Sequence, residues 1–329
     1  MRICVFGAGS IGGLVAGLLA RDGRDVSIIA RGAHLRAIQA DGLRVRTPEG
    51  EFATQPTATD DPAALGAQDL VVVATKTTAL PEIASRIAPL LHAGTRVAFA
   101  VNGVFWFYAH GLPDAPDVVR LDPGGALAHA VGAARALGII VHASAEVVEP
   151  GLVVNPNGGR MLVGDATPGP DDRAREIAAA LACPGLAVTA TGDLRREMWA
   201  KLARNVGSSP VACLTGADSH AIAEVPALGR MADALRRETL AVAAAQGYLG
   251  ITLEAGQTLS PLPIKPSMLQ DLERRRPMEI ETQLAIVQDL GRQTGVATAV
   301  LDDLLPLLVL RARVAGCLPA GMAFEETGP

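Results

Sequence analysis

The chain has 329 residues, of which 49% are hydrophobic and 19% are charged; this is ordinary for a globular protein of about two domains and excludes a disordered chain. A net charge of −5 and only 3% aromatic residues argue against a nucleic-acid-binding surface, which needs positive charge and, for single strands, stacking rings. The cysteines show neither metal-ligand spacing nor a disulfide framework, so we expect a reducing compartment and no metal site. They are Cys4, Cys183, Cys213 and Cys317.

The first apolar stretch, residues 3–20, resembles a signal peptide in length and hydrophobicity. A signal peptide also needs a basic leading region and a cleavage site of small residues. Here glycines interrupt the stretch instead, and three of them have the spacing G-x-G-x-x-G. No other stretch approaches the roughly 18 apolar residues that cross a membrane. We therefore expect a soluble, cytoplasmic protein that begins with its first strand.

The start of the chain predicts a dinucleotide-binding turn. Residues 2–6 (RICVF) are typical of a buried parallel strand, and an Ala/Leu/Gly-rich helix follows the glycine motif. In such a motif the glycines permit a tight turn, a close approach of the pyrophosphate and close packing of the helix, whose first amides face the phosphates. A flexible turn before a buried helix is the alternative. The predicted cofactor-binding residues are Gly7, Ala8, Gly9, Ser10, Ile11 and Gly12.

The residue after the second predicted strand (25–30) bears on the choice between NAD and NADP. NAD-binding folds place an Asp or Glu there, on the ribose 2′-hydroxyl. This chain has Arg31, with no carboxylate between Val26 and Leu35. A guanidinium can bind a 2′-phosphate with two hydrogen bonds, whereas an acid would repel it. The sequence therefore favours NADP(H), with a solvated surface arginine as the alternative.

Further apolar stretches at 70–74, 96–100 and 138–141 alternate with helix-compatible segments such as 80–91. This alternation predicts an α/β fold of the Rossmann type, with a doubly wound parallel sheet that binds ligands beyond the carboxyl ends of its strands. Lys76 and Asn102 follow two such ends, and this position makes them candidate cofactor-binding residues. A solvated lysine and an ordinary Asn-Gly turn are the alternatives.

The second half of the chain predicts helices and no convincing strands. The helical segments are 193–208, 226–247, 267–291 and 298–315. We therefore expect a Rossmann-type NADP-binding domain over 1–192 and a mostly α-helical catalytic domain over 193–329. Lys201 and Asn205 lie four residues apart, so they share one helix face, and Ser209 extends the row if the helix reaches it. A second row with this spacing comprises Ser267, Asp271, Arg275 and Glu279. Solvated helix faces are the alternative for both rows.

Over nearly its whole length the chain resembles the ketopantoate reductase (2-dehydropantoate 2-reductase) family. The two blocks from the second half are much more specific than the glycine motif. The residues that carry the resemblance are GAGSIG at 7–12, Arg31, Lys76, Asn102-Gly103, EMWAKLARN at 197–205 and SMLQD…E at 267–279.

The resemblance implies NADPH-dependent reduction of a 2-oxo acid to a 2-hydroxy acid, with ketopantoate of pantothenate biosynthesis as the leading substrate. It implies that Lys201 is the catalytic general acid and that Glu279 is the carboxylate that orients it. Such a donor makes chemical sense, because hydride addition to a ketone builds an alkoxide. The cofactor contacts that it implies are 7–12, Arg31, Lys76 and Asn102. The implied substrate-binding residues are Asn102, Lys201, Asn205, Ser209 and Ser267.

The chain departs from the family pattern in three places. The family often carries asparagines at the positions of Ser209 and Ile264, and the loss of such contacts can change discrimination between substrates by orders of magnitude. The aromatic stretch 104–108 (VFWFY) predicts either a buried plug or the wall of an apolar pocket.

Two other functions remain open at this point. One is a related NADP-dependent dehydrogenase that acts on a bulkier keto substrate, and the other is a non-catalytic NADP(H)-binding sensor. In the enzyme reading, the site is a crevice between two lobes, the partner is a small 2-oxo acid, and neither a nucleic acid nor a membrane takes part. The apolar C-terminal helices also allow a homodimer.

Overall fold

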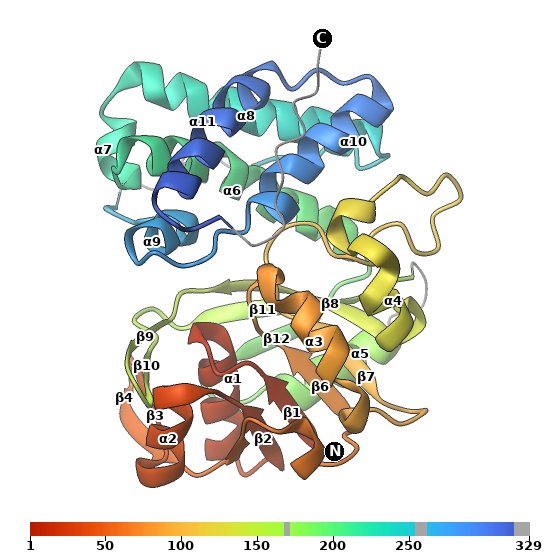
Figure 1. Cartoon of the computed structure of the whole chain (residues 1–329), viewed down its shortest axis with the longest axis vertical. Coiled ribbons are helices and arrows are strands. Elements are labelled where there is room, and N and C mark those ends of the chain that lie inside the picture. The colour runs from red at the N-terminus through yellow and green to blue at the C-terminus, as the bar shows by residue number, and fades with distance from the viewer. Residues whose placement is uncertain (168–171, 254–261, 319–329) are drawn as a thin grey trace. The chain divides into compact units, whose positions relative to one another are not determined.

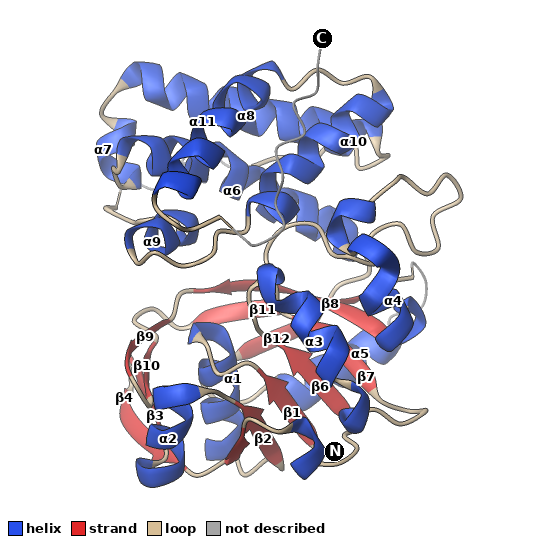
Figure 2. Cartoon of the chain, in the orientation of Figure 1, coloured by secondary structure: helices blue, strands red, loops and turns tan. Residues whose placement is uncertain are grey.

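A computed structural model of the chain describes residues 1–167, 172–253 and 262–318. They divide into two compact units, one up to Leu194 and the other from Arg195 onward (Figure 1). The first unit combines strands and helices, and the second consists of helices (Figure 2). An α/β fold with a helical second part is thereby confirmed.

The first unit is built on a large, mostly parallel sheet. Its strand order is β12-β11-β8-β7-β6-β1-β2-β5, and β11 pairs antiparallel with β8 while the other neighbours run parallel. The sheet is therefore mixed, with β11 and β12 reversed relative to the rest. Its strands are β1 (Ile3–Phe6), β2 (Val26–Ile29), β5 (Thr57–Thr59), β6 (Leu70–Val73), β7 (Arg96–Phe99), β8 (Ala136–Ala143), β11 (Gly159–Asp165) and β12 (Ala187–Ala190).

A second, smaller sheet has the order β4-β3-β10-β9 and was not predicted. Its strands are β3 (Leu43–Thr47), β4 (Gly50–Thr54), β9 (Glu146–Glu149) and β10 (Leu152–Val154). The helices of this unit are α1 (Ser10–Arg21), α2 (Gly32–Asp41), α3 (Leu80–Arg86), α4 (Ala126–Ala130) and α5 (Asp172–Leu181).

Helix α1 packs against strands of both sheets, including β1 and β2 on one side and β3 and β10 on the other. A side chain in place of Gly17 would put its Cβ 2.4 Å from Val45 Cγ2, and one in place of Gly13 would lie 2.7 Å from Val153 Cγ2. These two glycines let the small sheet approach the helix closely. Since both sides of the helix are covered, it needs no polar face, which explains why residues 3–20 are almost entirely apolar.

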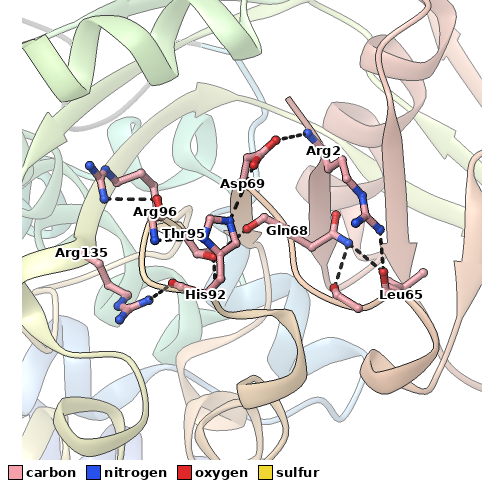
Figure 3. A network of polar contacts seen from close by, with 10 residues as sticks. Arg2, Leu65, Gln68, Asp69, His92, Thr95, Arg96 and Arg135 are labelled. Atoms are coloured by element: carbon pink, nitrogen blue, oxygen red, sulfur yellow. Dashed lines mark hydrogen bonds and ion pairs between the residues drawn. The ribbon is translucent and has the colours of Figure 1, made fainter.

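A polar network joins the amino ends of β1, β6 and β7 (Figure 3). The Arg2 backbone amide donates to Asp69 Oδ2 over 2.7 Å, and the Arg2 guanidinium donates to the Leu65 carbonyl over 2.8 Å. Nearby, the Thr95 hydroxyl donates to the Gln68 carbonyl over 2.7 Å. The network therefore fixes the amino ends of these strands. In such folds, ligands bind at the opposite edge, beyond the carboxyl ends.

The aromatic stretch after β7 is buried. The Phe105 and Phe107 rings stack with centroids 5.1 Å apart, and Phe99 contacts Trp106 edge to face at 5.8 Å. All four side chains are at most 7% exposed. They form a hydrophobic plug within the first unit.

The second unit begins with the long helix α6. No helix among the described residues is long and apolar enough to cross a bilayer. The helices of the second unit are α6 (Leu194–Thr215), α7 (Ser219–Ala223), α8 (Pro226–Ala245), α9 (Ser267–Glu273), α10 (Ile286–Thr294) and α11 (Ala299–Val314). A π-helical turn at Glu281–Ala285 leads into α10.

One predicted helix, 267–291, is wrong as a continuous element. Helix α9 ends at Glu273, and Arg275 adopts a left-handed conformation with φ of 52°. Pro277 follows, and it disfavours helical geometry at the residue before it. The four-residue spacing of Ser267, Asp271, Arg275 and Glu279 therefore does not describe one helix face.

We expect Arg275→Gly to stabilise the protein. A left-handed conformation costs a residue with a side chain about 1 kcal/mol, a cost that glycine largely avoids. The free energy of unfolding from urea titration should rise by about that amount. Arg274, with φ of −93°, provides the control, and Arg274→Gly should leave stability unchanged or lower it. A destabilised Arg275→Gly protein would contradict this explanation of the break.

Candidate functional site

The glycine turn between β1 and α1 has the geometry of a phosphate-binding loop. Gly7 has φ of 111°, and a side chain in place of Gly12 would put its Cβ 1.8 Å from the Gly7 carbonyl oxygen. Gly9 is exposed as the N-cap of α1, with no side chain capping the helix and no acidic residue in the first turn. The amides of Ser10 and Ile11 belong to this uncapped turn. The residues present therefore fit a dinucleotide pyrophosphate.

Backbone hydrogen bonds hold neighbouring strand tips together at this carboxyl edge. The Gly7 amide donates to the Ile29 carbonyl over 3.1 Å, and the Ala74 amide donates to the Phe6 carbonyl over 3.0 Å. Lys76 follows β6 and Asn102 follows β7, and both are half-buried. Both residues thus lie in loops at the edge that carries the glycine turn.

Arg31 lies at the end of β2 as the N-cap of α2, and it is already engaged. Its Nη1 donates to Glu82 Oε1 and Oε2 on α3, over 2.8 and 2.9 Å. Glu82 also pairs with Arg86 at 3.1 Å. The side chains of Arg31 and Glu82 are 65% and 42% exposed, so the pair contributes at most about 1 kcal/mol. Sequence reasoning missed Glu82 because it comes from a distant segment.

Helix α6 continues past Ser209, so Lys201, Asn205 and Ser209 form one row along it. Burial lowers the pKa of Lys201 from its ordinary value to about 8. The negative charge of Glu279 limits that fall, and the positive charge of Arg204 adds to it. An ammonium with a pKa near 8 is mostly protonated at neutral pH and can still release its proton.

Glu279 connects to the α6 row through Gln283. Glu279 is 3% exposed and Gln283 is 2% exposed. Gln283 Nε2 donates to Glu279 Oε2 over 3.4 Å, and Asn205 Nδ2 donates to Gln283 Oε1 over 3.1 Å. The structure thus brings Lys201, Asn205 and Glu279 together within the second unit. Gln283 was missed in the sequence, although its position four residues after Glu279 was a usable signal.

The remaining predicted substrate residues have different surroundings. Ser209 is buried at 3% exposure, directly before Pro210 within α6. Ser267 is the first residue of α9 and is exposed, and Ile264 is 51% exposed.

Across 1–167, 172–253 and 262–318, no group of three or more His, Cys, Asp or Glu side chains is placed to hold a metal ion.

Comparison with known proteins assigns the chain to a family. The model described as ketopantoate reductase PanE/ApbA matches residues 3–168, and the model of the C-terminal part of that family matches 193–311. A 2-dehydropantoate 2-reductase of Mesorhizobium japonicum is 38% identical over 96% of this chain and 99% of its own. A 2-dehydropantoate 2-reductase of Halobacterium salinarum is 30% identical over 95% of this chain and 99% of its own.

A solved structure agrees with these matches. The crystal structure of a candidate ketopantoate reductase from Ralstonia solanacearum is 35% identical, covers 96% of this chain and 98% of its own, and superposes with a TM-score of 0.89. Both units are thus matched to one family, in the same order along the chain. This chain is a member of the ketopantoate reductase family.

Proposed function

We propose that this protein reduces a 2-oxo acid to a 2-hydroxy acid with NADPH, with ketopantoate as substrate and pantoate as product. The observation that carries the proposal is the Lys201 ammonium, whose pKa of about 8 is set by burial against the opposing charge of Glu279. The family and the names of its curated members support the substrate. The role that follows is a step in pantothenate biosynthesis.

Residues of the first unit would hold the cofactor. The glycine turn 7–12 would bind the pyrophosphate at the α1 amides, and Arg31 would bind the 2′-phosphate by exchanging Glu82 for it. Lys76 and Asn102 would bind the cofactor at the ends of β6 and β7, with Asn102 also reaching the substrate. The bound nicotinamide supplies the hydride.

Residues of the second unit would handle the substrate and the proton. Lys201 would donate its Nζ proton to the carbonyl oxygen as negative charge develops there, which is the work of a general acid. Glu279 would keep the lysine charged and orient it. Asn205, Ser209 and Ser267 would bind the rest of the substrate.

A non-catalytic NADP(H) sensor would have no need of a desolvated lysine beside a buried carboxylate. A related reductase of bulkier keto acids shares this mechanism and differs only in the residues that surround the substrate. Ser209 and Ile264, where the family often has asparagine, are where that difference would arise.

Lys201→Ala should lower kcat for ketopantoate by about 100- to 10,000-fold, because general acid catalysis contributes that much. NADPH oxidation is followed at 340 nm with ketopantoate and with bulkier branched and aryl 2-oxo acids. Lys265→Ala, which removes an exposed lysine paired with Glu273, is the control and should keep full activity. Equal turnover by wild type and Lys201→Ala would overturn the assignment of the proton donor, and a preference for a bulky acid would overturn the assignment of the substrate.

Glu279→Gln should lower the pKa of Lys201 below 8, by about 1 pH unit or more, because the substitution removes the negative charge that raises this pKa. The chain has only three lysines, Lys76, Lys201 and Lys265, so ¹³C-methylation and NMR titration resolve each one. Ketone reduction needs the protonated amine, so its rate falls as pH rises through this pKa. The fall should therefore begin at lower pH in the variant. A Lys201 titration that does not move would contradict the coupling.

Glu82→Gln should strengthen NADPH binding up to about 5-fold and leave NADH binding nearly unchanged, because it frees Arg31 from an exposed ion pair worth at most about 1 kcal/mol. Arg31→Ala should weaken NADPH binding by about 10-fold or more, and NADH binding much less. Dissociation constants come from calorimetry. Glu176→Gln on α5 is the control for the loss of one exposed negative charge. If Arg31→Ala weakened both cofactors equally, the preference for NADP would have no basis.

A further inference from the structure

Three buried or half-buried polar side chains form a continuous chain of hydrogen bonds in the second unit. It starts at the Glu279 carboxylate, passes through the Gln283 amide and ends at the Asn205 amide on α6. Glu279 and Gln283 are both almost completely buried, so an unmade hydrogen bond there is costly. The three residues therefore constrain one another's orientation.

Gln283 lies in an irregular stretch of backbone. It is the central residue of the π-helical turn Glu281–Ala285, which precedes α10. Turns of this type are rare, and they occur frequently at functional sites. Here the turn accompanies a glutamine that bridges a residue near its own helix and a residue on α6.

The carboxylate gives this chain of hydrogen bonds a direction. An ionised carboxylate only accepts hydrogen bonds, so Gln283 must present its NH₂ group to Glu279. The Gln283 carbonyl oxygen then faces Asn205, which must present its own NH₂ group in turn. The reverse arrangement would set oxygen against oxygen at one contact and NH₂ against NH₂ at the other. The Asn205 carbonyl oxygen, Oδ1, then takes no part in the contact with Gln283 and can accept a hydrogen bond from a ligand, and the second hydrogen of the Asn205 NH₂ group can also be donated.

We propose that Gln283 is a positioning residue that fixes the Asn205 amide so that Asn205 offers a hydrogen-bond acceptor to the substrate. The inference rests on the proposed function, since it assigns the kind of contact that one substrate-binding residue makes. An acceptor suits a hydroxyl group of the substrate and disfavours a carboxylate. Asn205 thereby selects 2-oxo acids with a hydroxyl group within its reach, and Gln283 acts on selectivity only through Asn205.

The first test does not depend on catalysis. The chain contains four asparagines, Asn102, Asn155, Asn157 and Asn205, so selective ¹⁵N-asparagine labelling gives a simple spectrum of side-chain amides, and Asn205→Ala assigns one pair. The references are Asn155, whose Nδ2 donates to two carbonyl groups, and the exposed Asn157. The Asn205 NH₂ group should exchange with solvent markedly more slowly than that of Asn157. Exchange as fast as at Asn157 overturns the proposal without the use of any Gln283 variant.

Gln283→Met keeps the volume of the side chain and removes both hydrogen bonds. It should speed exchange at the Asn205 amide by about 10-fold or more. The matched control is Gln288→Met, since Gln288 is a buried glutamine on α10 that donates to Asp302 Oδ1 over 2.6 Å. The control should leave the Asn205 amide unchanged. Unchanged exchange in a folded Gln283→Met protein overturns the proposal.

The second test is a double-mutant cycle on kcat/KM with ketopantoate. Asn205→Ala should lower kcat/KM by about 10- to 100-fold, mainly by raising KM. Gln283→Met should lower kcat/KM by a large part of the same factor. The double variant should cost little more than Asn205→Ala alone, because Gln283 acts through Asn205. Additive losses overturn the positioning role. If the wild type reduces no 2-oxo acid, the proposed function fails, and the exchange measurements still decide whether Gln283 fixes the Asn205 amide.

Discussion

The first unit depends on how closely its neighbours can approach the backbone of α1. The Gly12 Cα lies against the Gly7 carbonyl, and Gly13 and Gly17 lie against valines of the small sheet, at distances that leave no room for a side chain. Because the helix packs this tightly on both sheets, its first turn is fixed relative to the carboxyl edge of β1, β2 and β6. The same absence of side chains that builds the core leaves the first amides of α1 uncapped at that edge. The fold and the proposed phosphate binding thus require the same residues.

The second unit presents a different kind of constraint, namely a charge that is partly removed from water. The Lys201 ammonium loses solvation on folding, and the buried carboxylate of Glu279 offsets part of that loss. A surface lysine remains fully charged over the whole physiological range and gives up its proton reluctantly. Burial brings the pKa of Lys201 down to where the proton can be transferred. The position that suits an acid catalyst is therefore one that is unfavourable for an isolated charge.

Elements whose signal is local could be predicted from the sequence. The strand–glycine–helix start, the strands β2, β6 and β7, and helices α6, α8 and α11 all carry periodic apolar residues or well-placed turn residues. The small sheet was missed because its strands are short, and because its two local pairs, β3–β4 and β9–β10, join each other across about a hundred residues of sequence, as Val45 and Val153 do. The break after α9 was missed because the four-residue spacing of polar groups was given more weight than Pro277. Periodicity reports a possible helix face, and it does not report whether the backbone continues.

The site could be predicted only in part, for a related physical reason. The types of its residues follow from sequence motifs, whereas their electrostatic partners come from distant segments. Arg31 binds Glu82, fifty-one residues farther along the chain, and Asn205 binds Gln283, seventy-eight residues away. In both places a carboxylate determines which hydrogen-bonding groups of a predicted site residue a ligand can use. In the functions that we propose, Glu82 would compete with the 2′-phosphate of NADPH for the Arg31 guanidinium, and Glu279 would orient the Asn205 acceptor through Gln283. Because a carboxylate only accepts hydrogen bonds, one acidic residue is enough to set the direction of every amide connected to it.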